Sequence, residues 1–281
     1  MLNSTILSYV TFIYFFIFMF YLMMMIMGKE IYGRIATYVS LAALLVHAFA
    51  IVLRWFESYQ MGVGHAPLSN LYESLIFFSW TIVLLYLLVE WRTKNRGLGV
   101  LVIPLVFLAM AYASFSPNIS SRIQPLVPAL KSNWLIAHVI TCFVGYAAFA
   151  LSFALSIIYL IKSSQTENRK NLFIMLTPVR EALDELNYQM VAIGFIMLSL
   201  GIITGSVWAH SAWGKYWQWD PKETWSLITW LVYAAVLHSR MMIGWRGKKI
   251  AWLSIFGFFC VIFTYLGVNF LLAGLHSYAK G

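Results

Sequence analysis

Eight apolar runs divide this sequence from end to end, and they limit the folds open to it more than any other feature. They cover approximately residues 6–27, 35–53, 71–91, 97–115, 134–162, 188–209, 223–243 and 251–274. An α-helix rises about 1.5 Å per residue, so a run of about 20 apolar residues crosses about 30 Å of hydrocarbon. The pattern predicts an all-α fold: a polytopic helical membrane protein with about eight transmembrane helices, forming one integral membrane domain over residues 1–281.

The composition excludes an ordinary soluble domain. Hydrophobic residues make up 62% of the chain and charged residues only 10%, against about 25% charged residues in soluble domains. Cys142 and Cys260 lie inside apolar runs without Cys-x-x-Cys spacing, and we interpret them as small core residues. The run at 6–27 lacks a basic n-region and a small-residue cleavage site, which indicates a retained span rather than a signal peptide.

The positive charges predict the orientation of the helices. Most of the 19 Lys and Arg residues fall in the connections between runs 1 and 2, 3 and 4, 5 and 6, and 7 and 8. The positive-inside rule places these connections, including residues 163–187, in the cytoplasm or plastid stroma. Both termini and the connection at 210–223 then face the periplasm, the outside or the thylakoid lumen. This bias accounts for the net charge of +9 without nucleic acid as a partner.

One outer connection is unusually rich in tryptophan. Trp213-Gly-Lys-Tyr-Trp217-Gln-Trp219-Asp-Pro-Lys-Glu-Thr-Trp225 contains four of the 12 tryptophans. Flat aromatic rings beside a helix start suit a flat apolar ligand that also carries negative charge. Haem, with its porphyrin face and two propionates, is such a ligand, and we expect this loop to bind it. The alternative is a belt of aromatic side chains at the lipid headgroups, although a belt needs neither this tight spacing nor the Gly and Pro.

The end of this loop predicts a helix start. Asp220, Pro221 and Glu223 fit an N-cap, a proline at the first helical position and the glutamate of a capping box. A helix N-terminus pointing into the outer loop attracts anions, and Lys222 adds positive charge. Two similar starts are expected elsewhere, at Asn70 with Glu73 and at Thr177 with Pro178. Three acidic residues after the latter are expected to be solvated: Glu181, Asp184 and Glu185.

Depth separates the six histidines. His138 near the start of the fifth run and His276 just past the eighth are expected at the level of the Trp-rich loop. As a pair, they can serve as axial ligands to one haem iron, although each alone also fits an interfacial structural role. His238 lies in the inner half of the seventh run, where ionisable residues are functional candidates, and its second ligand would come from another subunit. Non-ligand roles are expected for His65 and His210, while His47 lies within the second run.

Several motifs together resemble one family. Trp213-Gly-x-Tyr-x-x-Trp219-Asp220-Pro-Lys-Glu-Thr-Trp225 is similar to the "WWD" motif of the haem-handling proteins of cytochrome c assembly. Gly64-His-x-Pro-Leu-Ser-Asn-Leu-Tyr-Glu-Ser74, Leu126-Val-Pro-x-Leu-x-Ser-x-Trp-Leu-x-x-His138, Gly201-Ile-Ile-Thr-Gly205 and Leu237-His-x-Arg240 resemble its CcsA (ResC) branch. The resemblance covers most of the chain from about residue 40 onward.

The resemblance implies a role in the system II pathway of cytochrome c biogenesis. His138 and His276 match the family's two outward-facing histidines, which ligate haem b at the Trp-rich loop, and His238 matches its membrane-embedded histidine. The inner haem is ligated jointly with a CcsB (ResB) partner. Haem then passes outward for attachment to the Cys-x-x-Cys-His of apocytochrome c. The chain alone would be half of a holocytochrome c synthase (haem lyase).

The sequence therefore predicts a protein that transports and presents haem, with Trp213, Trp217, Trp219, Asp220 and Trp225 binding it and no catalytic side chain. No nucleophile or paired carboxylates are placed to help, so positioning of the reactants is the expected device. Two alternatives remain. A subunit that delivers haem to a chaperone would have about six spans and no motif around His65. A membrane b-type cytochrome would need two bis-histidine pairs within the helices, where only His47 and His238 lie.

Overall fold

The computed structural model describes residues 2–164 and 172–272, which form helices and their connections. Eight long helices run through this part of the chain: α1 (Leu2–Met27), α2 (Glu30–Gln60), α3 (Leu71–Thr93), α4 (Gly99–Phe115), α5 (Asn133–Ser164), α7 (Arg180–Trp213), α8 (Pro221–Met241) and α9 (Lys248–Ile262). The short elements are η1 (Pro128–Leu130), α6 (Leu172–Leu176), the π-helical turn η2 (Phe263–Gly267) and α10 (Val268–Leu271). The predicted all-α class is confirmed.

Seven of the predicted apolar runs each lie largely within one long helix, whereas the described part of the eighth run continues from α9 through η2 and α10. The described helices support a polytopic membrane protein. Six of the described segments are long and apolar enough to cross a bilayer: α1, α2, α3, α5, α7 and the segment from α9 to α10. α4 is apolar but has only 17 residues, and α8 is not among the six. The number of crossings and the side on which the termini lie therefore stay predictions.

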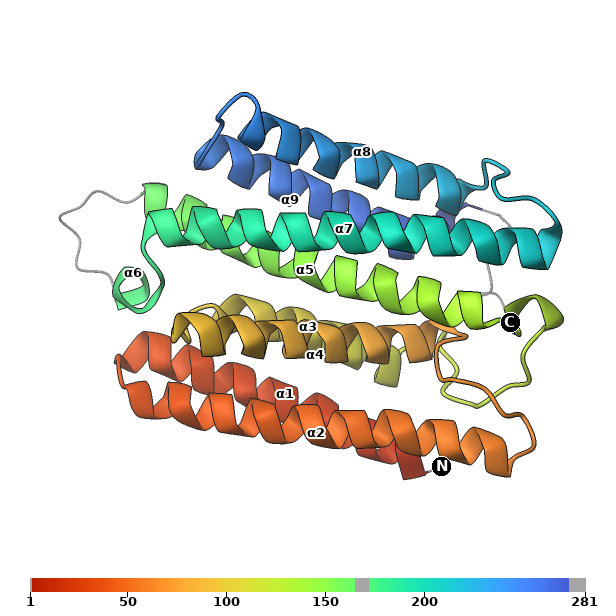
Figure 1. Ribbon diagram of the computed structural model, residues 1–281. Coiled ribbons are helices and arrows are strands. Elements are labelled where there is room, and N and C mark those ends of the chain that lie inside the picture. The colour runs from red at the N-terminus through yellow and green to blue at the C-terminus, as the bar shows by residue number, and fades with distance from the viewer. Residues whose placement is uncertain (1, 165–171, 273–281) are drawn as a thin grey trace.

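The long helices lie side by side in two groups (Figure 1). α1 to α4 form one group, and α5, α7, α8 and α9 form the other. α3 packs against α5 and joins the groups. The connections α2–α3, α4–α5 and α7–α8 lie at one end of the bundle, which we call the Trp-loop end, and the others lie at the α6 end.

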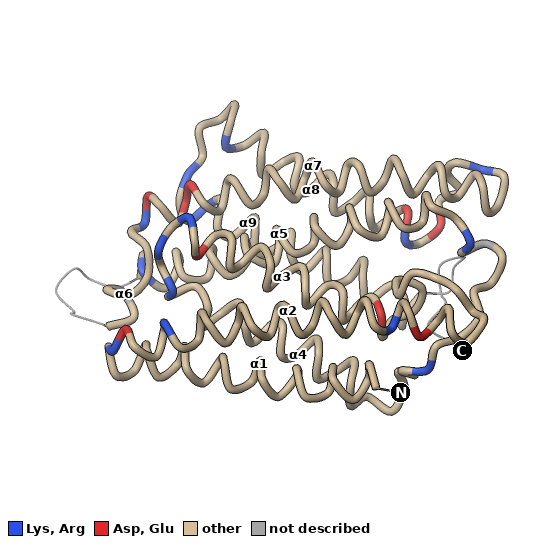
Figure 2. Tube along the Cα trace, turned by 60° about the horizontal axis from the view of Figure 1, so that its bottom comes forward, with Lys and Arg blue, Asp and Glu red and all other residues tan. Residues whose placement is uncertain are grey.

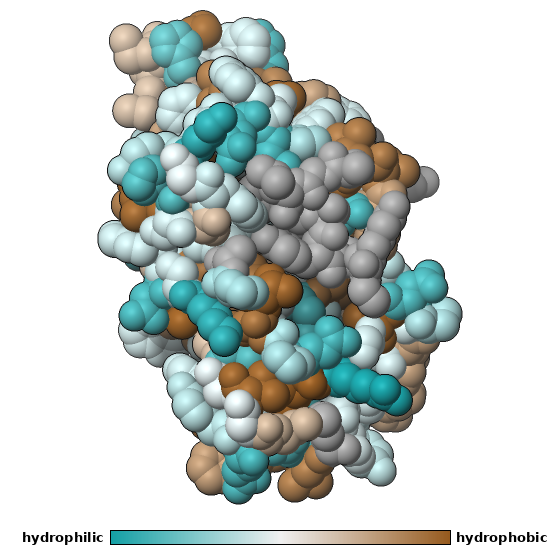
Figure 3. Space-filling view, turned by 90° about the vertical axis from the view of Figure 1, so that its right-hand side faces the viewer, coloured by the Kyte–Doolittle hydropathy of each residue, from teal (hydrophilic) through white to brown (hydrophobic). Residues whose placement is uncertain are grey.

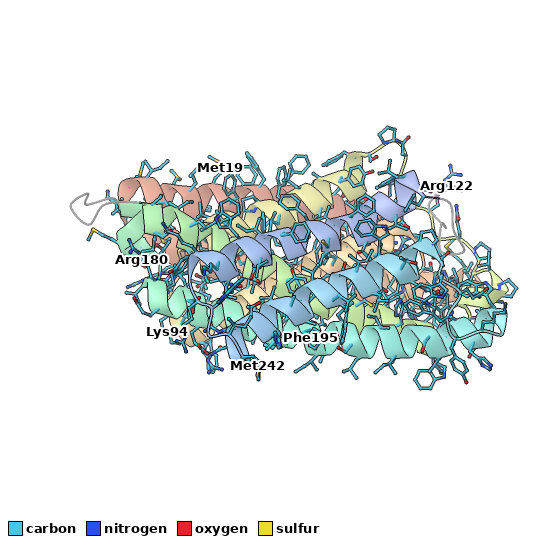
Figure 4. All side chains as sticks on the ribbon, turned by 90° about the horizontal axis from the view of Figure 1, so that it is seen from above. Met19, Lys94, Arg122, Arg180, Phe195 and Met242 are labelled. Atoms are coloured by element: carbon cyan, nitrogen blue, oxygen red, sulfur yellow. The ribbon has the colours of Figure 1, made fainter. Side chains whose placement is uncertain are left out.

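Charge is distributed unevenly between the two ends. Lys and Arg gather mainly at the α6 end, and fewer lie at the Trp-loop end (Figure 2). Lys94 and Arg180 mark the first end, and Arg122 marks the second (Figure 4). Few charged residues lie along the middle of the bundle (Figure 2), as expected for a hydrocarbon environment.

Glycines allow α5 and α7 to pack closely along their length. A Cβ on Gly145 of α5 would lie 3.1 Å from the Gly194 carbonyl oxygen, and a Cβ on Gly194 of α7 would overlap the Phe149 ring. Small residues at a helix interface let the backbones approach, which is how membrane helices gain packing energy. This close pair carries His138 on one helix and the Trp-rich loop at the end of the other.

Buried ion pairs lie near both ends of the bundle. Nε of Arg54 lies 2.8 Å from Oε1 of Glu73, with both side chains almost fully buried. Near the α6 end, Arg240 donates to Asp184 over 2.6 Å and to Glu185 over 3.1 Å. The prediction that Asp184 is solvated was wrong, because Asp184 is buried between Arg240 and the Gly247 amide.

The helix starts were predicted with mixed success. Asn70 caps α3, and its side chain accepts from the Glu73 amide over 2.9 Å, as expected. The predicted cap at Thr177 is wrong: α7 begins at Arg180 after Val179, and the Thr177 hydroxyl donates instead to the Phe173 carbonyl. The 163–187 connection accordingly includes α6 and the first residues of α7.

Candidate functional site

A cavity of about 200 Å³ opens at the Trp-loop end between the two helix groups. Its walls come from the start of α3, the halves of α5 and α7 nearer the Trp-loop end, the loop after α7, the start of α8 and the η2 turn. Among the lining residues are His138, Trp217, Lys222, Glu223, Tyr265 and Asn269. Seen end-on, this face has apolar patches between polar groups (Figure 3). An apolar hollow with a few polar groups is typical of a ligand site.

His138 lies on the α5 wall of this cavity, and its ring is held in one orientation. Its Nδ1 lies 2.7 Å from the Gly201 carbonyl oxygen. Because a carbonyl only accepts, Nδ1 carries the proton, and the lone pair of the neutral imidazole is on Nε2. Trp208 stacks beside the ring with centroids 6.0 Å apart and planes inclined by 19°. A histidine fixed through its other nitrogen in this way is typical of a metal ligand.

Two glycines of α7 make room for α5 side chains, one for His138 and one for Cys142. A Cβ on Gly205 would lie 2.6 Å from Nδ1 of His138, and one on Gly201 would lie 2.5 Å from Sγ of Cys142. Any larger residue at 205 would push the imidazole away from its present place. The Gly201-Ile-Ile-Thr-Gly205 motif therefore has a direct structural role at the cavity, which the sequence indicated only through family resemblance.

The four predicted tryptophans occupy different positions and do not form one surface. Trp217 lines the cavity. Trp213 packs edge-on against Trp208, with centroids 4.9 Å apart. Trp225 lies on Phe263, with centroids 4.1 Å apart, and Trp219 is 68% exposed. The structure therefore places the Trp217 ring in the cavity lining and the Trp213 ring against Trp208, which stacks beside His138. The Trp225 ring lies against η2, and the Trp219 ring is outside the cavity.

The predicted helix start after the loop is confirmed. Asp220 is the N-cap of α8 and accepts from the Lys222 amide over 3.0 Å. Oε2 of Glu223 accepts from the Asp220 amide over 3.2 Å, which completes the capping box. Asp220 is buried by this arrangement and has a structural place in the loop. The residues of the helix start that line the cavity are Lys222 and Glu223.

The wall formed by η2 was not predicted. Tyr265 donates or accepts a hydrogen bond with Ser74 of α3 over 2.8 Å. Thr264 bonds to the Trp225 carbonyl of α8 over 3.1 Å. Asn269, beyond the turn, also lines the cavity. A π-helical turn often marks a functional site, but it has no clear signal in a single sequence, and the apolar run at 251–274 indicated only a helix.

His238 is placed far from the cavity, on the exposed surface of α8 near the α6 end. It is seventeen residues beyond Pro221, which corresponds to about 25 Å along the helix axis. The structure therefore separates His238 from His138, as the predicted inner and outer sites require. His276 lies outside the described residues, so its pairing with His138 stays a prediction.

The other three histidines have structural surroundings. His47 is fully buried, and its Nδ1 lies 3.1 Å from the Tyr14 hydroxyl. Both ring nitrogens of His65 lie about 3 Å from carbonyl oxygens, those of Ala66 and Gln124. His210 is exposed and stacks on Tyr216. These surroundings favour the expected non-ligand roles of His65 and His210.

Comparison with known proteins identifies relatives over most of the chain. Residues 68–276 match the family model described as "Cytochrome C assembly protein". A protein named "Cytochrome c biogenesis protein CcsA" from Heterosigma akashiwo is 40% identical, covering 91% of this chain and 88% of its own length. Proteins of the same name from Pyropia yezoensis and Prochlorococcus marinus are 41% and 39% identical, covering 88% and 89% of this chain and 87% and 86% of their own lengths.

A solved structure has a similar fold. The chain named "Cytochrome c Heme Lyase CcmF" superposes with a TM-score of 0.68 at 17% sequence identity. The match covers 94% of this chain and 46% of that one, so the present chain spans about half the length of that protein. At this low identity, the similarity concerns the arrangement of the helices alone.

Proposed function

This chain belongs to the family of cytochrome c assembly proteins, and we propose that it moves haem across a membrane and holds it at the Trp-rich loop for attachment to apocytochrome c. A role in cytochrome c maturation follows from the family. The observation that supports the finer proposal most directly is the orientation of His138: its Nδ1 donates to the Gly201 carbonyl, so Nε2 is the ring nitrogen that would ligate iron.

In this proposal, haem b is the transported substrate and His138 provides one axial ligand at the outer site. His276 provides the other. The cavity gives the porphyrin an apolar seat beside Trp217, and Lys222 and the N-terminus of α8 attract the propionates. Because the cavity is narrow, part of the porphyrin edge stays outside, where its vinyl groups can meet incoming thiols.

The attachment step needs positioning more than acid–base chemistry. Each reduced thiol of Cys-x-x-Cys-His adds across one vinyl C=C bond, so a C–S bond forms, the thiol hydrogen ends on carbon and nothing leaves. The protein's contribution is to hold haem and peptide in register. The histidine of the peptide then replaces one axial ligand of the iron.

The inner site requires a partner. An imidazole exposed to lipid is costly, and His238 lies on the exposed surface of α8. A CcsB (ResB)-type subunit that covers this surface would shield His238 and supply the second axial ligand. We place the complex in a bacterial inner membrane or a thylakoid membrane, with all eight long helices crossing and the α6 end facing the cytoplasm or stroma, because Lys and Arg gather there.

A visible absorption spectrum tests this proposal. The protein is purified in detergent with and without its partner, as wild type and as His138→Ala, His276→Ala and His238→Ala. We expect a low-spin haem spectrum that the outer and inner substitutions weaken separately, and added imidazole should partly restore the signal of His138→Ala. His210→Ala is the matched control, because His210 is exposed and stacks on the lining residue Tyr216 but does not itself line the cavity. A colourless wild-type complex would contradict the proposal.

The two alternatives predict different spectra. A membrane b-type cytochrome would lose haem when His47 is replaced, whereas the proposed synthase subunit would not. A subunit that delivers haem to a chaperone would retain the outer site but would not support thioether formation with an apocytochrome peptide. The high identity to CcsA proteins over most of the chain supports the synthase subunit.

A further inference from the structure

Trp219 has a backbone conformation that bulky residues rarely adopt. Its φ is 58°, in the left-handed region, and Lys94 is the only other non-glycine residue with positive φ in the described ranges. Lys94 is the C-cap of α3, where this conformation is common. Trp219 caps no helix C-terminus. Such a conformation at a bulky residue costs free energy and persists only where the surroundings enforce it.

The carboxylate of Glu223 holds Trp219 in this left-handed backbone conformation. Oε2 of Glu223 accepts from the amide of Gln218 over 2.7 Å and from the amide of Asp220 over 3.2 Å. These amides belong to the residues on either side of Trp219. Glu223 is itself buried, and bonds from buried amides to a charged oxygen are among the stronger hydrogen bonds of proteins. One oxygen atom therefore clamps the backbone immediately before and after the strained residue.

This geometry exceeds what a helix cap needs. A capping box requires only that the N3 glutamate accept from the N-cap amide, here that of Asp220. The shorter of the two bonds goes instead to Gln218, two residues before the cap. The bond from the Gln218 amide contributes nothing to α8, and its effect is to fix the peptide units around Trp219.

The Trp219 ring is an exposed ring next to one residue of the cavity lining. Trp219 is 68% exposed, and its ring meets Trp217 edge-on with centroids 5.7 Å apart. Trp217 in turn lines the cavity. Pockets that enclose a drug-sized ligand have volumes of about 300–1,000 Å³, and this cavity has about 200 Å³. A haem seated against His138 would therefore extend beyond the cavity, and Trp219 is an exposed ring that contacts the lining residue Trp217.

We propose that Glu223 is a positioning residue that holds Trp219 in its left-handed conformation, so that the indole contacts the part of the porphyrin outside the cavity. This inference rests on the proposed function, because haem is the ligand. In this inference, Glu223 affects haem binding by fixing the position of the Trp219 ring. The backbone strain is maintained because the ring is needed next to Trp217, not because it stabilises the fold.

Haem titration of the purified complex with its partner tests the link between the two residues. Trp219→Ala and Glu223→Ala should each weaken binding roughly tenfold, about the contribution of one aromatic contact. The double variant should bind no more weakly than either single variant. Glu223→Gln should retain most of the affinity, because its amide oxygen still accepts. Glu181→Ala, at an exposed first-turn glutamate of α7, is the matched control.

Two results of the titration would overturn the proposal. If the two losses multiply to about a hundredfold in the double variant, the residues act independently. If Trp219→Ala binds haem as the wild type does, the ring has no role in binding. Both results require a wild type that binds haem, so they are distinct from failure of the proposed function itself.

A second measurement needs no haem. Glycine adopts the left-handed conformation without strain, so Trp219→Gly should raise the melting temperature of the haem-free protein while lowering its haem affinity. In that background, Glu223→Ala should lower the melting temperature more than in the wild type, because only in the wild type does loss of the Glu223 bonds also release the strain at Trp219. An equal drop in both backgrounds would show that Glu223 serves only the helix cap, and the proposal would be wrong.

Discussion

Nδ1 of His138 on α5 donates its proton to the carbonyl oxygen of Gly201 on α7 over 2.7 Å. This bond joins the two most closely packed helices at the cavity and fixes which nitrogen of the imidazole carries the lone pair. Gly205 leaves room for the His138 ring, and Gly201 leaves room for Cys142 on the next turn of α5. The orientation of the His138 ring and the packing of the two helices are therefore consequences of the same small-residue motif.

Gly205→Ala should separate haem binding from overall folding. The new Cβ would lie 2.6 Å from Nδ1 of His138, so the ring must move and lose its bond to Gly201. Disturbing the outer partner of a ligand lowers metal affinity about 10- to 100-fold, and we expect that loss in a haem titration. Overpacking should also lower stability by about 1–3 kcal/mol.

Ile203→Ala is the control for this substitution. Ile203 lies on the same helix and is 59% exposed, facing away from the cavity. Its replacement should leave haem affinity unchanged. If Gly205→Ala binds haem normally while remaining folded, His138 does not depend on its present orientation, and its assignment as a ligand through Nε2 would be contradicted.

Gly267→Ala should disturb the base of the Trp-rich stretch through Phe263. A Cβ on Gly267 would lie 2.7 Å from the Phe263 ring, and that ring lies on Trp225. We expect a loss of about 1–3 kcal/mol in stability from this overpacking. In a Phe263→Leu background the same substitution should cost less, because the smaller side chain leaves room. Equal costs in both backgrounds, measured by thermal unfolding, would show that Phe263 does not transmit the effect.

Some of the fold and the site could be predicted from the sequence, and local chemistry explains which parts. The long apolar runs indicated the helices because burial in lipid selects composition over many residues. The cap at Asp220 was predictable because the two bonds of its capping box join residues no more than three positions apart. The false cap at Thr177 had the right residue types, but the hydroxyl bonds instead to the carbonyl of Phe173 on α6.

Features that depend on distant residues were not visible in the sequence. Glu73 was interpreted as a helix-cap residue, and no sequence pattern linked it to Arg54. The structure shows that they form a buried ion pair. The η2 turn and the different positions of the four tryptophans also depend on contacts between helices. A single sequence does not record which helices are neighbours, so these parts of the site required the structure.

The Arg54–Glu73 pair should contribute strongly to stability. Arg54 also donates to the Ser121 carbonyl over 2.8 Å, and Glu73 accepts from the amide and hydroxyl of Ser69, which lines the cavity. Removing one partner leaves an uncompensated buried charge, so Arg54→Met should cost about 3–5 kcal/mol. The double variant Arg54→Met with Glu73→Leu should recover part of this loss in denaturant unfolding.

The exposed pair of Arg96 and Glu30 gives a matched control. Their atoms lie 3.2 Å apart, but Glu30 is 53% exposed, so Glu30→Gln should cost at most about 1 kcal/mol. If Arg54→Met were no more costly than Glu30→Gln, the buried pair would not be a main support of the cavity wall at Ser69.

Substitution of His47 distinguishes the proposed function from a membrane b-type cytochrome. His47 is fully buried, contacts the Tyr14 hydroxyl and does not line the cavity. His47→Leu keeps an apolar volume in the core but leaves that hydroxyl without its partner, at a cost of about 1–3 kcal/mol in stability. The haem content and the absorption spectrum of the purified complex should not change, because in the proposed synthase subunit His47 binds no iron. Loss of a low-spin haem signal in His47→Leu, with His138→Ala still retaining it, would instead indicate ligation within the helices and favour the electron-transfer alternative.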